Sequence, residues 1–144
     1  MFSKACEYGI KAAIYIALNS HDGKRVSLKE IAKEIDSPEA FTAKILQDLV
    51  RHQIINSVKG AYGGFEIEKK NIGSIKLCEI VNAIDGDKIY LGCGLGLHTC
   101  TESHPCPVHD QFSIIRNELR TMLETTNLEQ LVLGLKSGRS FLKV

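Results

Sequence analysis

The chain lacks any long apolar run. No stretch of its 144 residues approaches the roughly 18 apolar residues that a membrane-spanning helix needs, so we expect no membrane anchor. Its first residues also lack a basic region that leads into an apolar stretch, so we expect no signal peptide and a cytoplasmic location. The net charge is only +1, so charge alone gives no argument for a nucleic-acid partner.

Motifs of enzymes are lacking too. We find no paired carboxylates in a pocket-like context, no nucleophile motif and no phosphate-binding loop, and we therefore expect that the protein is not an enzyme. What the chain does contain is typical of one globular domain, because 44% of its residues are hydrophobic and 24% are charged.

The first part of the chain predicts three short helices. Apolar residues at helical spacing place these helices at about residues 3–19, 27–35 and 38–52. Ser27 and Glu30 have the spacing of a capping box at the start of the second helix. We expect Ser37 as the N-cap of the third helix and Pro38 as its first residue.

The third helix has two different faces. Phe41, Ile45 and Leu49 form the stripe that we expect to face the core. The opposite face is small near its start and polar or basic along its length, and it consists of Ala40, Ala43, Lys44, Gln47 and Arg51. A helix that lies in the major groove of DNA has this character, but so does an ordinary solvent-exposed helix face. The helix by itself leaves both interpretations open.

A β-hairpin is predicted after the third helix. Two β-rich segments, 54–58 and 65–68, flank a glycine-rich turn. Three helices followed by a hairpin describe a mostly α-helical winged helix-turn-helix, in which the hairpin is the wing. Lys59 and Tyr62 at its tip suit a contact with the DNA backbone or minor groove. The predicted DNA-binding residues are Ser37, Glu39, Ala40, Ala43, Lys44, Gln47, Arg51, Lys59 and Tyr62.

The second part predicts three further helices around an irregular stretch. The longest, at about residues 107–124, carries apolar residues at alternating spacings of four and three, namely Val108, Phe112, Ile115, Leu119 and Met122. This heptad seam suits packing against the same helix of a second copy, although a helix packed on its own domain can show so short a pattern. Residues 1–86 would then form the DNA-binding region, 87–106 a cysteine-bearing loop and 107–144 the dimerisation helix and a last helix, all in one compact domain.

Three of the five cysteines gather in the irregular stretch. Their spacing is Cys93-x6-Cys100-x5-Cys106-x2-His109. Thiolates are soft ligands that suit iron–sulfur clusters, zinc or copper(I). The close cysteine pairs of structural zinc sites are missing, and wide spacing on a glycine-containing loop fits an iron–sulfur cluster better. His109 is the nearest candidate for a fourth ligand.

Other interpretations of these cysteines stay open. They could bind a structural zinc ion, or they could be thiols of a surface loop that respond to oxidation. Cys6 and Cys78 lie within helical patterns, so we expect each to be a small buried hydrophobic residue.

With these features, nearly the whole chain resembles the Rrf-type winged-helix regulators. The resemblance is carried by Ala17-Leu18-Asn19 in the first helix, Gly63-Gly64-Phe65 at the wing, Ile84-Asp85-Gly86 after the fourth helix, and the three cysteines. It implies a homodimeric transcriptional regulator whose third helix enters the major groove and whose wing touches the minor groove. It also implies sensing of redox state, nitric oxide or iron–sulfur status.

The resemblance further implies an iron–sulfur cluster on Cys93, Cys100 and Cys106, with [2Fe–2S] favoured over [4Fe–4S] and zinc as the alternative. In such regulators the fourth ligand is a histidine shortly after the third cysteine, which His109 matches, or an acidic residue in the first helix of the partner subunit, which Glu7 matches. The chain departs from some relatives at Ala43 and Lys44, where they carry glutamate and glutamine, and at Lys59, where they carry arginine. The DNA sequence that it binds therefore cannot be carried over.

Overall fold

The protein is described from a computed structural model, which covers residues 1–143. It is mostly helical with one two-stranded antiparallel sheet, as the sequence predicts. The elements are α1 (Lys4–His21), α2 (Leu28–Glu34), α3 (Glu39–Arg51), β1 (Asn56–Val58), β2 (Gly64–Glu66), the 3-10 helix η1 (Lys69–Asn71), α4 (Leu77–Asp85), α5 (Lys88–Leu91), α6 (His109–Thr125) and α7 (Leu128–Lys136).

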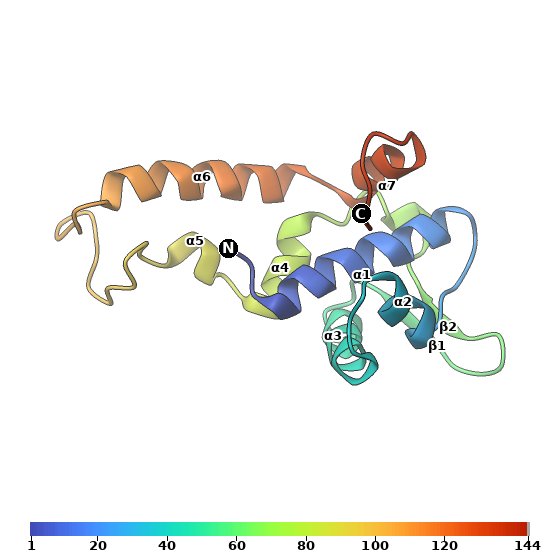
Figure 1. The fold of residues 1–144 in the computed structure, drawn as a ribbon. Coiled ribbons are helices and arrows are strands. Elements are labelled where there is room, and N and C mark those ends of the chain that lie inside the picture. The colour runs from blue at the N-terminus through green and yellow to red at the C-terminus, as the bar shows by residue number, and fades with distance from the viewer. Residues whose placement is uncertain (144) are drawn as a thin grey trace.

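Helix α1 lies at the centre of the globular body and contacts α2, α3, α4 and α7 (Figure 1). Its N-cap is Ser3, whose hydroxyl accepts a hydrogen bond from the backbone N–H of Cys6 and donates one to the carboxylate of Asp85 at the end of α4. Gly9 lets α1 and α4 approach closely, because a Cβ atom there would lie 2.0 Å from Cδ1 of Ile84. The start of the chain is thus joined to α4, the helix that leads to the cysteines.

The wing is joined to the body by a third extended segment. Asn56 pairs with Glu66 and Val58 with Gly64, and Phe65 also forms an isolated bridge with Val26. Gly64 adopts a φ of 139°, and a Cβ atom there would lie 2.7 Å from the carbonyl oxygen of Val26, so this position requires glycine. The close approach of the two backbones sets where the wing begins.

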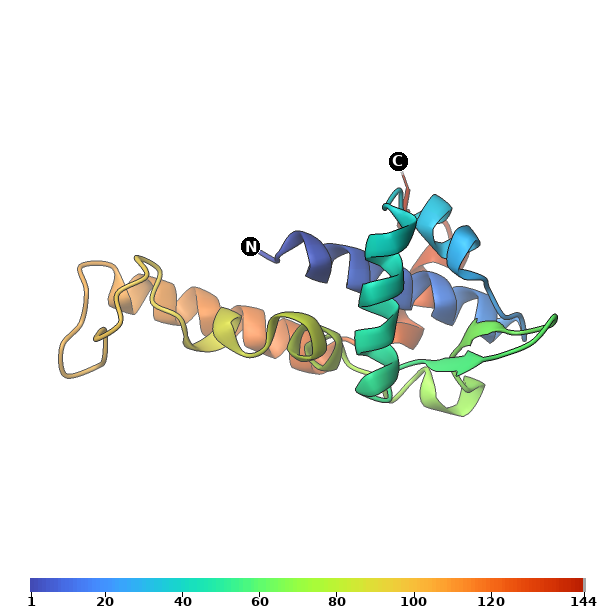
Figure 2. The same ribbon diagram turned by 90° about the horizontal axis from the view of Figure 1, so that it is seen from below.

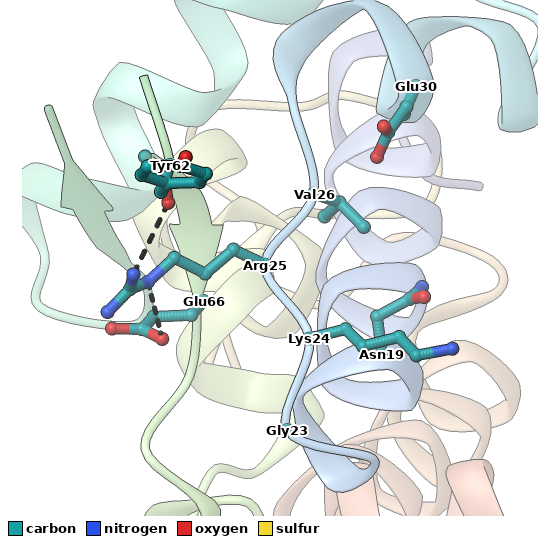
Figure 3. Close-up of a pocket in the computed structure, with 9 residues that line it drawn as sticks. Asn19, Gly23, Lys24, Arg25, Val26, Glu30, Tyr62 and Glu66 are labelled. Atoms are coloured by element: carbon teal, nitrogen blue, oxygen red, sulfur yellow. Dashed lines mark hydrogen bonds and ion pairs between the residues drawn. The ribbon is translucent and has the colours of Figure 1, made fainter. Parts of the chain in front are cut away.

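Arg25 also holds the wing. Its Nε donates a hydrogen bond to the carboxylate of Glu66 at 3.0 Å, and its NH1 donates one to the carbonyl oxygen of Tyr62 at 3.3 Å (Figure 3). The guanidinium therefore ties the strand and the tip of the wing to the segment before α2. No local sequence pattern indicates this role of Arg25, because its partners lie about forty positions away in the chain.

Helix α6 projects from the body as an arm, with α5 and the cysteine-bearing loop running beside it (Figures 1 and 2). Leu123, near its C-terminal end, is the one fully buried residue of this helix. The guanidinium of Arg120 lies 5.1 Å from the ring centroid of Tyr90, and Arg116 donates a hydrogen bond to the carbonyl oxygen of Gly92. These contacts join α6 to α5 and to the start of the loop.

Two details of the sequence-based prediction are wrong. Ser37 does not cap α3: Pro38 is the N-cap, and the Ser37 hydroxyl instead accepts a hydrogen bond from the hydroxyl of Thr42 at 2.9 Å. Phe41 is not a core residue, since it is 37% exposed and packs edge-on against Tyr8, while Thr42 is fully buried in its place. The buried face of α3 is thus rotated slightly from the predicted one. The Thr42 hydroxyl can be buried because it has two polar neighbours at 2.9 Å, the Ser37 hydroxyl and the carbonyl oxygen of Pro38.

Candidate nucleic-acid interface and metal centre

The outward face of α3 is accessible along its whole length. Ala40, Lys44, Gln47 and Arg51 are exposed, and Ala43 beside them is half-buried. The opposite face of α3 is buried in the core and carries Ile45, Leu46 and Leu49. The guanidinium of Arg51 pairs with the carboxylate of Asp48 at 3.1 Å, so part of its charge is already compensated. This face offers small side chains, an amide and two cations to a partner.

The wing lies beside α3, on the side of the molecule from which Figure 2 is viewed. Tyr62 at its tip is 92% exposed, and Lys59 is exposed as well. Glu39 is exposed at the first turn of α3, while Ser37 is half-buried before it. The structure therefore places the helix and the wing where a duplex could contact both.

The three clustered cysteines converge at the far end of the arm. Cys93 follows α5, Cys100 lies in the loop, and Cys106 precedes α6, yet their Sγ atoms all lie within 4.8 Å of one another. The Sγ atoms of Cys93 and Cys106 are 3.6 Å apart. Nδ1 of His109, the first residue of α6, lies 3.2 Å from Sγ of Cys100. The loop thus assembles three soft donors with an imidazole beside them.

Backbone groups of the loop hold the thiols in place. The N–H of Leu95 donates to Sγ of Cys93, and the N–H of Cys106 donates to Sγ of Cys100, both at 3.4 Å. The backbone N–H groups of Leu97 and Leu95 lower the pKa of Cys93 from 9.0 to about 7, because they stabilise the thiolate. Burial raises the pKa of Cys106. Near neutral pH about half of Cys93 is therefore in the thiolate form, which is the form that binds metals.

The donor set fits a metal ion or a cluster. A tetrahedral zinc ion with Zn–S bonds of about 2.3 Å holds its sulfurs about 3.8 Å apart, which is close to the separation of Cys93 and Cys106. Three thiolates with one further ligand also satisfy the four ligand positions of an iron–sulfur cluster. Both kinds of group are therefore compatible with these residues.

Glu7 lies elsewhere in the chain. It is in the first turn of α1, where its carboxylate pairs with Lys4 at 3.1 Å. His98 and His104 are exposed, and Nδ1 of His104 lies 3.2 Å from the Ser103 hydroxyl. Within one chain the cysteines therefore have His109 as their neighbouring imidazole.

A winged helix-turn-helix with three converging cysteines defines a class of regulatory DNA-binding proteins, and comparison with known proteins supports this class. Residues 2–133 match the Rrf2 family model, described as an iron-dependent transcriptional regulator, and the chain belongs to this family. The family comprises transcriptional regulators and not enzymes.

Individual relatives agree with this assignment. A putative HTH-type transcriptional regulator of Aquifex aeolicus is 30% identical over 134 residues, which cover 92% of this chain and 91% of the relative. The structure of CymR, the global cysteine regulator of B. subtilis, superposes with a TM-score of 0.74 at 23% identity, covering 92% of this chain and 95% of CymR. The structure of T. potens IscR gives a TM-score of 0.71 at 19% identity, covering 98% of this chain and 92% of IscR. These two structures support the fold.

Among residues 1–143, no helix combines the length and the apolar character that crossing a membrane requires.

Proposed function

We propose that the protein is a homodimeric DNA-binding transcriptional regulator of the cytoplasm, which senses redox state, nitric oxide or iron–sulfur status through a cluster on Cys93, Cys100 and Cys106. The observation that carries this proposal is the convergence of the three thiols within 4.8 Å, in a chain of a family described as iron-dependent regulators. The cluster is a [2Fe–2S] cluster in preference to [4Fe–4S].

Double-stranded DNA binds to the exposed face of α3 and to the wing. Gln47 and Lys44 face base edges in the major groove, where amide and ammonium groups find hydrogen-bond acceptors. Lys59 and Tyr62 contact the backbone or the minor groove, and Ser37 and Glu39 lie at the edge of the contact. Ala40 and Ala43 permit close approach, and Arg51 supplies charge to the phosphates.

His109 is our first choice for the fourth ligand, since its Nδ1 already lies 3.2 Å from Sγ of Cys100. Glu7 of the partner subunit is the alternative. When bound, an iron–sulfur cluster supplies reversible electron transfer at a potential set by its ligands. An imidazole or carboxylate in the ligand set makes it more labile than four thiolates would.

The sensed signal reaches the DNA-binding surface through α6. Cys106 and His109 lie at the start of this helix, and α6 is also the helix that we expect to pack against the partner subunit. A change at the thiols therefore alters how the two wing-bearing bodies are spaced. Regulation requires that the occupied site favour one spacing of the two DNA-binding bodies. A ligand with equal affinity for two states does not shift the equilibrium between them.

The test is an anaerobic preparation of the wild type and Cys93→Ala, with visible spectra and iron, sulfide and zinc analysis. Cys78→Ala is the matched control, since this half-buried thiol lies on α4 outside the site. We expect a brown wild type and control with matched iron and sulfide, and loss of both in Cys93→Ala.

A colourless anaerobic protein that contains zinc or only free thiols would overturn the cluster proposal and favour a second candidate function. That candidate is a winged-helix regulator with a structural zinc ion or a thiol switch, and the 3.6 Å separation of Cys93 and Cys106 is the observation in its favour. DNA binding is tested separately, by its salt dependence: phosphate contacts predict a steep loss of affinity as salt rises.

A further inference from the structure

An apolar hollow lies beside the exposed face of α3. It has a volume of about 480 Å³ and is open to solvent between α2, α3 and the wing. Its walls include carbon atoms of Leu28 from α2, Ala43 and Val50 from α3, and Phe65 from β2. Gln47, Arg51 and Ser57 also line it. An apolar recess is unusual on a surface otherwise supplied with amides and cations.

The apolar wall of the hollow favours an apolar occupant over a phosphate. Against Leu28, Ala43, Val50 and Phe65 a phosphate would lose water without gaining a hydrogen-bond partner, whereas the polar side chains that also line the hollow remain available to polar groups of the DNA. An apolar group of small size is favoured there instead, because it gains from leaving water.

Duplex DNA offers one such group in its major groove. Among the four bases only thymine carries a methyl group on that edge, and alanine and phenylalanine side chains are typical contacts of this methyl. Ala43 and Phe65 are both in the wall of the hollow. The DNA group that matches the recess is therefore the 5-methyl group of thymine.

Gln47 extends this specificity. It is exposed, lies one helical turn beyond Ala43 on the same face, and borders the hollow. A glutamine amide can donate to N7 and accept from N6 of adenine, and so distinguishes adenine from guanine. Residues four apart in a helix are separated by about 6 Å along its axis, whereas base pairs are about 3.4 Å apart, so the two residues can reach base pairs up to two steps apart.

We infer that Ala43 and Gln47 together select A·T pairs in each half-site, with a thymine methyl seated in the hollow and the adenine of a nearby pair held by the Gln47 amide. This inference rests on the proposed DNA-binding function and goes beyond it by naming the bases.

The experiment begins with selection of binding sites from random duplexes by the purified, anaerobically handled full chain. Each thymine of the selected site is then replaced singly by deoxyuridine, which lacks only the methyl group. We expect one thymine per half-site whose replacement weakens binding about fourfold, the effect of removing one buried carbon. In Ala43→Ser the ratio of the affinities for the thymine and deoxyuridine sites should fall to near one, because the hydroxyl brings water into the hollow.

Ala83→Ser is the matched comparison, because Ala83 is half-buried like Ala43 but lies on α4, outside the proposed DNA contact, and it should keep the wild-type ratio between thymine and deoxyuridine. If no sequence is enriched from the pool, sequence-specific DNA binding itself fails. If a sequence is enriched but lacks A·T pairs in its half-sites, or tolerates deoxyuridine at every position, the proposed function stands and this inference is overturned. An unchanged ratio in Ala43→Ser also overturns it, and the deoxyuridine test on the wild type does not depend on that variant folding.

Discussion

The five cysteines share a residue type but differ in environment. Cys6 is buried in α1, and burial, followed by the charge of Asp85, raises its pKa to about 12. Cys93 lies in the loop, where backbone N–H groups lower its pKa to about 7. Because the thiolate is the reactive form, the two residues should differ greatly in reactivity at neutral pH.

Alkylation of the metal-free protein with iodoacetamide tests this difference. A thiolate forms as the pH rises through the pKa, so Cys93 should reach half of its maximal rate near pH 7, two pH units below the ordinary value of 9.0. Cys6 should remain unmodified up to pH 9 until the protein is unfolded by denaturant. Peptide mass spectrometry across pH 5–9 measures both rates. Equal rates for the two thiols in the folded protein would contradict the environments described above.

The sequence indicates which cysteines gather but not which of their thiols has the lowest pKa. The spacing of Cys93, Cys100 and Cys106 was enough to predict a metal site, and the structure brings their Sγ atoms together. The spacing does not reveal which thiol has the lowered pKa. That depends on the N–H groups of Leu95 and Leu97, whose directions are set by the turns of the loop.

The C-terminus of α3 has glutamine at a left-handed position where glycine is the usual residue. Gln53 adopts a positive φ of 60°. Its N–H donates to the carbonyl oxygen of Val50 at 2.9 Å, and the N–H of Ile54 donates to that of Leu49 at 3.0 Å. This is a Schellman motif with glutamine where glycine is preferred, and a side chain in the left-handed region costs about 1–2 kcal/mol.

Replacing this glutamine should therefore stabilise the protein. We expect Gln53→Gly to raise the free energy of unfolding by about 0.5–1 kcal/mol, since relief of strain exceeds the extra entropy of glycine in the unfolded chain. Gln53→Ala keeps the Cβ atom and should be close to neutral. Denaturant unfolding of the three proteins measures the difference. A loss of stability in Gln53→Gly would show that the glutamine side chain has a stabilising role of its own.

Helix starts were predicted well where side-chain caps determine them. The predicted capping box of Ser27 with Glu30 is present at the start of α2. The prediction at Ser37 was wrong, because Thr42 competes for its hydroxyl. The short helices η1 and α5 were not predicted, since segments of three or four residues carry too little periodicity to be recognised.

At the scale of the whole molecule, the predicted heptad seam of α6 is exposed in part, whereas its Leu119 is half-buried and packs against the core. Phe112, Ile115 and Met122 are all exposed on α6, and Ile115 is 54% exposed. These are residues of the predicted heptad seam, and exposure on a projecting helix agrees with a role in pairing two copies. Homodimer formation through this seam is part of our proposal.

A charge placed in the seam should therefore separate the subunits. We expect Ile115→Glu to be monomeric at micromolar concentration and to lose at least tenfold in affinity for a palindromic site, because one DNA-binding body then acts alone. Thr121→Glu adds the same charge to an exposed position about 120° around α6 from Ile115, outside the seam, and should remain dimeric. Sedimentation velocity gives the oligomeric state, and fluorescence anisotropy gives the DNA affinity. If Ile115→Glu remained dimeric, the dimer interface would have to lie outside this seam.

The local sequence alone determined the mostly helical class, the wing, the main caps and the chemistry of the cysteine loop, because periodicity, capping residues and soft ligands act over a few residues. Tertiary structure alone decided what joins distant segments. Arg25 reaches Glu66 and Tyr62, Gly64 lies against Val26, and α2, α3 and the wing together enclose the hollow beside Ala43. Such contacts depend on the path of the backbone through the whole fold, and no short sequence pattern encodes that path.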